Sequence, residues 1–386
     1  MKTDKKKWLK LLREIPVSVN NFYGDPLIQW QDTCQKLEKL ISDKHRGPVS
    51  IITKGRIFDE QAKQLKKYSD AGLNLVVLLS ISELPQYESV GMEHRYTNIA
   101  VLNKYGVKVI VYLRPMVPPY NTSLKVINKI FRKLNKNGAK YVVASGFRGD
   151  KSIVDDMSPE KTNEWVLRVK LMSKDVYSYL KLNASKYNMH LFTRTSCGVD
   201  AILGNKSTYN PYYYSPNLVH CQDLNCPLKD VCKPVVKPKE GSLDFLKYLG
   251  YEIELEKGDC SLRCKTEPEK RLNCRSCCTT CFMLKVPRLI IKNKNVNLGD
   301  LTFARFITGM LVTKDGVVDN GDKNIALVKL PKFSDIDNIH CLNSWWPYAH
   351  VGDKCFDCKY CIERYYKSSR RDFGFSPAEL IGKINL

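Results

Sequence analysis

The chain has 386 residues, 43% of them hydrophobic, and a formal net charge of +22, which predicts one large domain with a smaller one, or two domains. The excess of Lys and Arg favours a polyanionic partner or an anionic substrate, with a solvated basic surface as the alternative. No apolar run is long enough to span a bilayer, and the start MKTDKKKWLKLLREIP lacks the apolar segment of a secretory signal, so we expect a cytoplasmic protein with no membrane partner.

Residues 16–200 alternate between strand and helix patterns. We expect six strands, over residues 16–23, 48–55, 73–82, 107–115, 139–146 and 189–196. The helices between them are expected at residues 31–42, 59–72, 94–106, 122–138 and 159–187. Three of these helices end in a glycine of the kind that caps helices, namely Gly72, Gly106 and Gly138. Continuous apolar strands separated by amphipathic helices predict a parallel sheet with helices outside it.

The strand–helix repeats contain no glycine-rich phosphate loop, which favours a barrel or partial barrel over a doubly wound sheet. In such folds the polar residues at the carboxyl ends of the strands form the site. In this chain those residues are Gly24, Asp25, Thr53, Lys54, Ser80, Ser82, Arg114, Ser145, Arg148 and Cys197.

The character of the chain changes after about residue 207. A tyrosine-rich loop, YNPYYYSPN, is followed by groups of cysteines and by shorter segments with turn signals, of which residues 311–330 predict a hairpin. We therefore expect three parts. They are a barrel-like part over residues 1–207, a cysteine-rich metal- or cluster-binding region over 208–340, and a cysteine loop with a helix over 341–386.

Fifteen cysteines in a chain expected to be reduced indicate metal or cluster ligands, not a disulfide framework. Cys34 and Cys197 stand apart, and Cys34 is expected to be a buried helix residue. The other thirteen form three groups. The first group is Cys221, Cys226 and Cys232; the second is Cys260, Cys264, Cys274, Cys277, Cys278 and Cys281; the third is Cys341, Cys355, Cys358 and Cys361.

The spacing within each group bears on the metal that it would hold. In the second group the first four cysteines suit tetrahedral zinc, whereas Cys274, Cys278 and Cys281 form a C-x3-C-x2-C triplet, so zinc and iron–sulfur both stay open. The first group has a proline beside its second cysteine, as cluster loops do, and would take a fourth ligand from Cys34, Cys197 or a small molecule. The third group fits a [4Fe–4S] cluster, with a structural zinc knuckle as the alternative.

Three stretches carry a resemblance to a known family: NNFYGDPLIQW, PVSIITKGR and LVVLLSISELPQYESVGMEHRYTNIAVLNKYGVKVIVYLRPMVPPYN. Their ordered motifs are GDP after one strand, TK after the next, S-x-S after the third, then E…R and R-P-x-x-P…N. With this set, residues 16–200 resemble the radical S-adenosylmethionine (SAM) superfamily. The resemblance is to its spore photoproduct lyase-like, or DNA-repair-photolyase-like, branch.

The resemblance implies a partial (β/α)6 barrel that holds a [4Fe–4S] cluster and SAM at the carboxyl ends of its strands. The residues it assigns to SAM are Gly24, Asp25 and Pro26 for the amino group, Thr53 and Lys54 for the carboxylate, Ser80 and Ser82 for the ribose, and Arg114 on the fourth strand. A zwitterionic cofactor needs oxygen acceptors for its amine and a cation for its carboxylate, which agrees with this set. The alternative for each residue is a satisfied polar group that caps a strand end.

The cluster motif that the resemblance implies is missing from its usual place, because no cysteine precedes the GDP strand. The tail offers Cys355, Cys358 and Cys361, with Tyr360 before the last. Joining the tail to the head gives the order cysteine loop, helix, GDP strand, so our hypothesis is a circularly permuted barrel completed by residues 345–386. The competing hypotheses are the triplet of the second group, and a barrel that has lost its cluster or relies on a partner chain that carries the motif.

The resemblance implies a radical SAM enzyme that forms a 5′-deoxyadenosyl radical and acts on an unidentified substrate, of lyase or transferase type. Basic charge and the photolyase-like resemblance point to nucleic acid as substrate, and an electron-donor protein is a second expected partner. Cys197 would return a hydrogen atom or ligate an auxiliary cluster, with a small buried residue as the alternative. The alternative functions are a non-catalytic, zinc- or cluster-bearing nucleic-acid-binding protein on a degenerate barrel, and an electron-transfer subunit.

Overall fold

The structure is a computed structural model, and the residues that it describes are 2–19, 24–84, 87–88, 92–117, 119–146, 171–172, 174–193, 195–204, 227, 235, 237–256, 287–293, 298–314, 317–318, 328–329 and 350–351. The chain divides into two compact units. The parallel-sheet unit comprises residues 13–205 and 224–227, and the mixed-sheet unit comprises residues 1–12, 206–223 and 228–386. Each unit is described by itself.

The parallel-sheet unit is built on a six-stranded sheet with the strand order β1-β2-β3-β4-β5-β7, and every neighbouring pair is parallel. The strands are β1 (Val17–Val19), β2 (Pro48–Thr53), β3 (Asn74–Ile81), β4 (Val109–Met116), β5 (Tyr141–Gly146) and β7 (His190–Phe192). Because the order follows the sequence without reversal, the sheet is singly wound. This confirms the predicted mixed α/β architecture with a parallel sheet.

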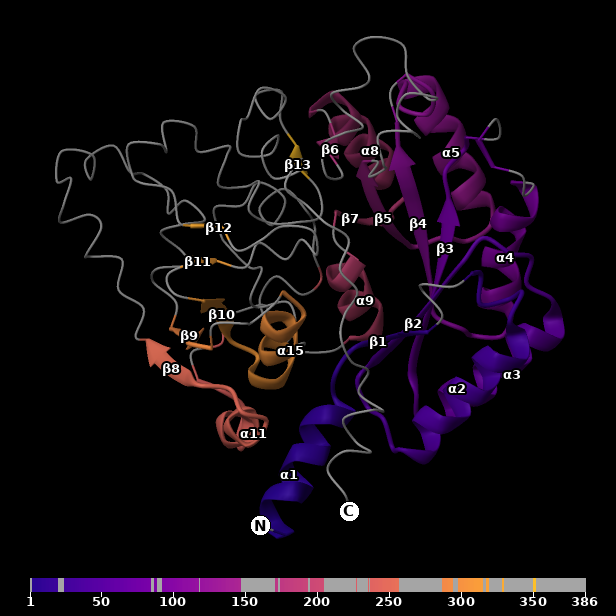
Figure 1. The fold of residues 1–386 in the computed structure, drawn as a ribbon. Coiled ribbons are helices and arrows are strands. Elements are labelled where there is room, and N and C mark those ends of the chain that lie inside the picture. The colour runs from indigo at the N-terminus through magenta and orange to yellow at the C-terminus, as the bar shows by residue number, and fades with distance from the viewer. Residues whose placement is uncertain are drawn as a thin grey trace, which may run out of the picture. The chain divides into compact units, whose positions relative to one another are not determined.

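One face of this sheet carries the connecting helices (Figure 1). They are α2 (Trp30–Ser42), α3 (Asp59–Asp70), α4 (Glu93–Lys104), α5 (Leu124–Lys136) and α8 (Lys174–Lys186). Right-handed crossovers between strands added in sequential order bring every connecting helix to the same face. Helix α5 packs an apolar stripe against that face, formed by Ile127, Ile130, Phe131 and Leu134.

The other face is covered by α9 (Thr195–Leu203), which contacts β2, β3, β4, β5 and β7 (Figure 1). Gly198 allows this close approach, because a Cβ atom there would lie 2.7 Å from the Cγ2 of Val143. With both faces covered, every residue of β3 after Asn74 is buried. Burial on both faces explains why the strands read as continuous apolar runs.

The three predicted capping glycines directly follow the C-cap residues of α3, α4 and α5. Their φ angles are +102° at Gly72, +69° at Gly106 and +78° at Gly138. These left-handed conformations end a helix at little cost only where the residue has no Cβ. The predicted ends of the three helices are therefore confirmed.

Two predicted elements differ from the structure. The single helix expected over 159–187 is wrong, because β6 (Leu171–Met172) precedes α8, which begins at Lys174. The short apolar run before α8 fits a strand or a helix equally well by periodicity. The strand expected over 189–196 ends at Phe192, and α9 begins at Thr195, so Cys197 lies in a helix and not at a strand end. Thr and Ser side chains favour helix starts over strand continuation in such a segment.

The mixed-sheet unit has a five-stranded sheet in the order β12-β11-β10-β9-β8. Its elements are α1 (Lys2–Arg13), α11 (Ser242–Tyr248), β8 (Ile253–Glu256), β9 (Arg288–Ile291), α15 (Leu298–Thr308), β10 (Leu311–Lys314), β11 (Val317–Val318) and β12 (Val328–Lys329), with β13 (His350–Val351) later in the chain. The β9–β10 pair is parallel and the others are antiparallel. The predicted hairpin is confirmed as β10 and β11, and β12 adds a third strand to it.

The core of this unit gathers around Trp8 of α1. Its ring stacks on Phe245 of α11 with centroids 5.4 Å apart and lies 4.6 Å from Tyr248. Phe245 is in turn in edge contact with Phe303 of α15. Among the described residues of both units, no helix is long and apolar enough to cross a membrane.

Candidate functional site

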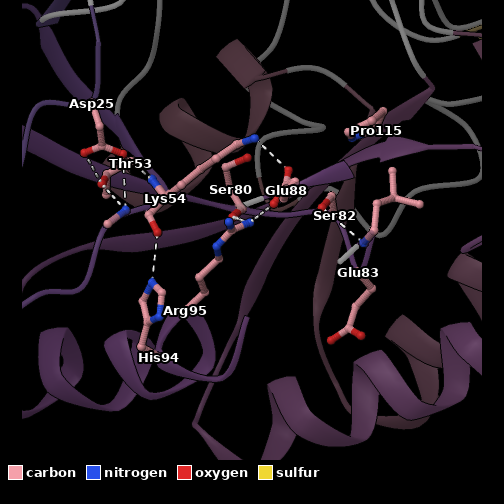
Figure 2. A network of polar contacts seen from close by, with 12 residues as sticks. Asp25, Thr53, Lys54, Ser80, Ser82, Glu83, Glu88, His94, Arg95 and Pro115 are labelled. Carbon is pink, nitrogen blue, oxygen red and sulfur yellow. Dashed lines mark hydrogen bonds and ion pairs between the residues drawn. The ribbon is translucent and has the colours of Figure 1, made fainter. Parts of the chain in front are cut away.

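The carboxyl ends of the parallel strands meet at one edge of the sheet, and polar residues from four neighbouring segments gather there (Figure 2). These segments follow β1, β2, β3 and β4 in sequence. The resemblance assigns the cofactor to this edge, and in open parallel sheets ligands bind there. We therefore call it the candidate site and describe its contacts in turn.

Asp25 ties the loop after β1 to the end of β2. Its Oδ1 accepts hydrogen bonds from the Leu27 amide (2.9 Å) and the Thr53 hydroxyl (2.7 Å), and its Oδ2 from the amides of Lys54 (2.6 Å) and Gly55 (3.2 Å). Four donors from the protein thus converge on one carboxylate. Asp25 acts as a structural clamp in this arrangement, and a contact of its carboxylate with a cofactor stays a prediction.

Lys54 leads a row of charges that crosses the edge of the sheet (Figure 2). Its ammonium lies 2.6 Å from Glu88 Oε1, and the other oxygen of Glu88 pairs with the guanidinium of Arg95. The Arg95 side chain is only 1% exposed, whereas that of Lys54 is 46% exposed. Burial raises the pKa of Glu88, but the hydrogen bonds from Lys54 and Arg95 outweigh this effect and hold the pKa below its usual value. The row therefore ends in a solvent-facing cation that is held in place by a buried ion pair.

Helix α4 fixes the backbone that carries Lys54. The Nε2 of His94 lies 3.0 Å from the carbonyl oxygen of Lys54. One turn later Asn98, which is buried, donates to the Gly55 carbonyl (2.8 Å) and accepts from the Ile57 amide (2.9 Å). Two residues four apart on one helix face thus hold the loop after β2 from both sides.

Asn121 performs a similar function between the ends of β3 and β4. Its amide donates to the carbonyl oxygens of Ser82 and Pro115, and its Oδ1 accepts from the Val117 amide (2.6 Å). The Ser82 hydroxyl accepts from the Leu84 amide at 3.3 Å, and Ser82 is fully buried. Ser82 is therefore a satisfied polar residue that closes the end of β3.

A second group of predicted residues lies on the face of the sheet that α9 covers. The strand register aligns Ser80, Tyr112, Val143 and Phe192 in one row across β3, β4, β5 and β7. The Tyr112 hydroxyl lies 2.8 Å from Thr195 Oγ1 at the start of α9.

Residues next to this row extend the group. The Arg114 guanidinium lies 3.6 Å from the centre of the Tyr112 ring. Ser145 lies two residues after Val143, hence on the same face, and its hydroxyl has no hydrogen-bond partner among the described residues. Cys197 is half-buried in the first turn of α9. These three residues come from β4, β5 and α9 and are associated with the α9-covered face.

The predicted cofactor residues thus divide between two faces. Thr53 is in register with Leu79, the neighbour of Ser80, so Thr53 and Ser80 point to opposite sides of the sheet. Cys34, expected to be buried, is half-buried in α2 and interacts with Tyr68 of α3. Burial and this thiol raise the pKa of Tyr68 above its usual value.

The thirteen cysteines of the three groups, together with Arg148, lie outside the described residues. Within the described ranges, no three His, Cys, Asp or Glu residues are placed to hold a metal ion. The distance between the tail cysteines and Gly24, which would test the permuted barrel, also falls outside them.

Sequence reasoning missed part of the site. It included E…R and a final N in the ordered motifs without giving these residues a role. Arg95 and Asn121 fit two of these letters, and Glu88 is the acidic residue that pairs with Arg95 in the structure. It did not single out His94 and Asn98, although their spacing of four on an expected helix would have placed them on one face. No protein-family model matches this chain, and no curated protein matches it.

Proposed function

We propose that this chain is a radical SAM iron–sulfur enzyme. The observation that carries the proposal is the convergence of the GDP, TK and S-x-S segments on one edge of a singly wound parallel sheet. When bound, a reduced [4Fe–4S] cluster and SAM would together supply a 5′-deoxyadenosyl radical that abstracts hydrogen from a substrate. The partial (β/α)6 barrel is part of this proposal.

The described residues fit the zwitterionic part of SAM. Lys54 offers a half-exposed ammonium to a carboxylate, and Glu88 holds that ammonium at 2.6 Å in its place. Four donors occupy the carboxylate of Asp25, and the carbonyl oxygens of Asp25 and Pro26 also accept hydrogen bonds, so we assign the amine of SAM to the backbone carbonyl of Gly24. The Ser80 hydroxyl, on the face covered by α9, is the residue we assign to the ribose.

Cys355, Cys358 and Cys361 are the residues that we assign to the cluster. Three cysteine ligands leave one iron open, and the tail would complete the barrel in a permuted order. Cys197 stays our candidate for returning a hydrogen atom to the substrate or for ligating an auxiliary cluster. Zinc in the second cysteine group remains compatible with this assignment.

Electron paramagnetic resonance of anaerobically purified, reduced protein tests the proposal. We expect a [4Fe–4S]⁺ signal whose g-values change when SAM is added, because SAM would bind the open iron. A signal indifferent to SAM would restrict the chain to electron transfer or structural clusters. Absence of iron in protein never exposed to air would contradict the proposal and favour the zinc-bearing binding protein.

A pair of lysine variants makes the test specific to the described edge. Lys54→Ala is expected to keep the iron signal but to require more SAM for the same change in g-values, since it removes the cation for the SAM carboxylate. Lys63→Ala changes an exposed lysine of α3 and serves as the control. Equal SAM titrations for both variants would place SAM elsewhere.

A further inference from the structure

The exposed side of α5 is a row of cations without an acidic residue. The helix, LKVINKIFRKLNK, contains no Asp or Glu. Four of its basic residues are exposed and follow one another at intervals of four, three and four: Lys125, Lys129, Arg132 and Lys136, which we call the basic stripe. Such intervals align side chains along one line of a helix, here over about 17 Å.

Several lysines of the other helices on the same face of the sheet pair with acidic residues. Lys36 pairs with Asp32 at 2.7 Å, and Lys39 with Asp43 at 3.4 Å. Lys104 of α4 pairs with Asp59 of α3 at 2.8 Å. Within the described part of the chain, no residue of the basic stripe forms an ion pair. The stripe therefore gathers four cations that form no ion pair among the described residues, whereas α2, α3 and α4 pair a part of their lysines.

Lys133 shows the difference within α5 itself. It lies beside the stripe and is only 25% exposed, with its ammonium 2.6 Å from Glu93 and 3.5 Å from Glu83. Glu93 also lies near enough to Lys129 for that charge to help lower the pKa of Glu93, after the larger effect of its hydrogen bond with Lys133. Both acidic residues that pair with α5 thus pair with Lys133, beside the basic stripe, and not with a residue of the stripe.

The opposite side of α5 is not available for insertion into a bilayer. Ile127, Ile130, Phe131 and Leu134 are at most 1% exposed, because they pack in the core of the parallel-sheet unit. An amphipathic helix that lies in the bilayer interface needs its apolar face for the lipid. The remaining face of α5 offers charge and the exposed amides of Asn128 and Asn135, which suit phosphate oxygens.

We propose that the basic stripe of α5 binds the phosphate backbone of a nucleic acid. One strand of a duplex carries a charge about every 3.4 Å along the axis, so the stripe spans about five phosphates. Because α5 follows β4, its first turn lies at the carboxyl edge of the sheet. Lys125 therefore stands at the end nearest the candidate site, and a bound strand would run towards that site. This inference does not depend on the proposed cofactor chemistry.

Fluorescence anisotropy of the full chain with a labelled duplex DNA, and with a single-stranded RNA of equal length, tests the inference. The stripe variant carries Lys125→Gln, Lys129→Gln, Arg132→Gln and Lys136→Gln. The control variant carries Lys36→Gln, Lys39→Gln, Lys63→Gln and Lys67→Gln on α2 and α3, so both lose four charges. Matching the loss of charge separates a local surface from the net charge of +22.

We expect the stripe variant to bind at least about 100-fold more weakly at about 0.1 M salt, and its salt dependence to lose a slope of about three to four. The control variant keeps most of the affinity and slope. A charge-conserving variant, Lys125→Arg with Lys129→Arg and Lys136→Arg, binds as the wild type does. Thermal unfolding of each variant establishes that it is folded. A preference between the DNA and the RNA identifies the polymer.

Equal losses in the stripe and control variants would overturn the inference, since binding would then follow net charge alone. Wild-type protein that binds neither polymer would also overturn it. So would stripe-dependent binding to vesicles of anionic lipid without binding to nucleic acid. Iron content and the response to SAM are measured on the same preparations, so failure here and failure of the proposed function are seen separately.

Discussion

At the scale of single residues, the contacts of Asp25 indicate that a carboxylate at a strand end can stabilise the fold through hydrogen bonds within the protein. Its two oxygens accept from Leu27, Thr53, Lys54 and Gly55. In Asp25→Asn, one carboxylate oxygen is replaced by an NH2 group, which cannot accept the hydrogen bonds that this oxygen receives. We expect the unfolding free energy in urea to fall by about 2 kcal/mol, the range of hydrogen bonds to a charged group.

The exposed Asp32 of α2 provides the control for this prediction. It pairs with Lys36 across one turn, and both side chains are about half exposed. Asp32→Asn is expected to cost less than about 0.5 kcal/mol, as exposed pairs do. Equal unfolding midpoints for Asp25→Asn and the wild type would show that the Asp25 carboxylate is not a clamp.

His45 predicts how stability depends on pH. It is 4% exposed, and burial lowers its pKa to about 4 against the opposing effects of Asp43 and a hydrogen bond with the Ile15 backbone. Above about pH 6.5 both the folded and the unfolded chain carry neutral histidine, so the group contributes nothing. Between pH 6.5 and 4 only the unfolded chain gains the proton, and stability is lost as the pH falls.

The measurement is the unfolding free energy of the wild type and of His45→Gln at about pH 7 and about pH 5. The fall from the higher to the lower pH should be about 2 kcal/mol larger in the wild type, at about 1.4 kcal/mol for each pH unit. Both proteins have the same carboxyl groups, so the contribution of these groups cancels when the two decreases in unfolding free energy are compared. Parallel profiles would mean that His45 is protonated in the folded chain.

At the scale of elements, α9 depends on one residue without a side chain. Gly198→Ala gains about 1 kcal/mol of helix propensity, but its Cβ would lie 2.7 Å from a methyl group of the buried Val143. We expect the steric overlap to outweigh the gain in helix propensity, so that the free energy of unfolding in urea falls by about 1–2 kcal/mol. Ser196→Thr adds a methyl group at a half-buried position of the same helix and should cost less. A Gly198→Ala protein more stable than the wild type would contradict this packing.

Hydrophobic periodicity predicted the longer helices correctly, and it failed in short segments whose pattern fits a helix and a strand equally well. The helices α2, α3, α4 and α5 were predicted within two residues at most of their boundaries, because each has several turns and a clear end. In contrast, β6 and the start of α9 lie in short segments that fit a strand or a helix equally well.

The same reasoning located the candidate site but not its contacts. Strand ends can be read from the sequence, so Lys54 and Asp25 were expected at the carboxyl edge. The pairing of Lys54 with Glu88 spans 34 positions, and that of Lys54 with His94 spans 40. Contacts at such separations depend on how loops and helices meet in space, which no local spacing encodes.

At the scale of the whole molecule, one boundary between the two units follows residue 205, close to the change in composition, but the start of the chain belongs to the other unit. Residues 1–207 were expected to form one part, yet residues 1–12 belong to the mixed-sheet unit. Trp8, Leu11 and Leu12, spaced by three and one, form the apolar face of a helix within the charged start of the chain, and they are buried. The high charge of this segment concealed that pattern.

Removal of the Trp8 side chain should therefore destabilise elements that lie far away in the sequence. Trp8 is 7% exposed and packs on Phe245 and Tyr248 of α11, so Trp8→Ala should destabilise the mixed-sheet unit by about 3–5 kcal/mol. Hydrogen exchange of the full chain is the measurement: amides of β9 and α15 should lose protection, whereas those of β3 and β4 should keep theirs. Trp30→Ala, on α2 of the parallel-sheet unit, should spare β9 and α15. Uniform loss of protection in Trp8→Ala would mean instead that the two units unfold as one.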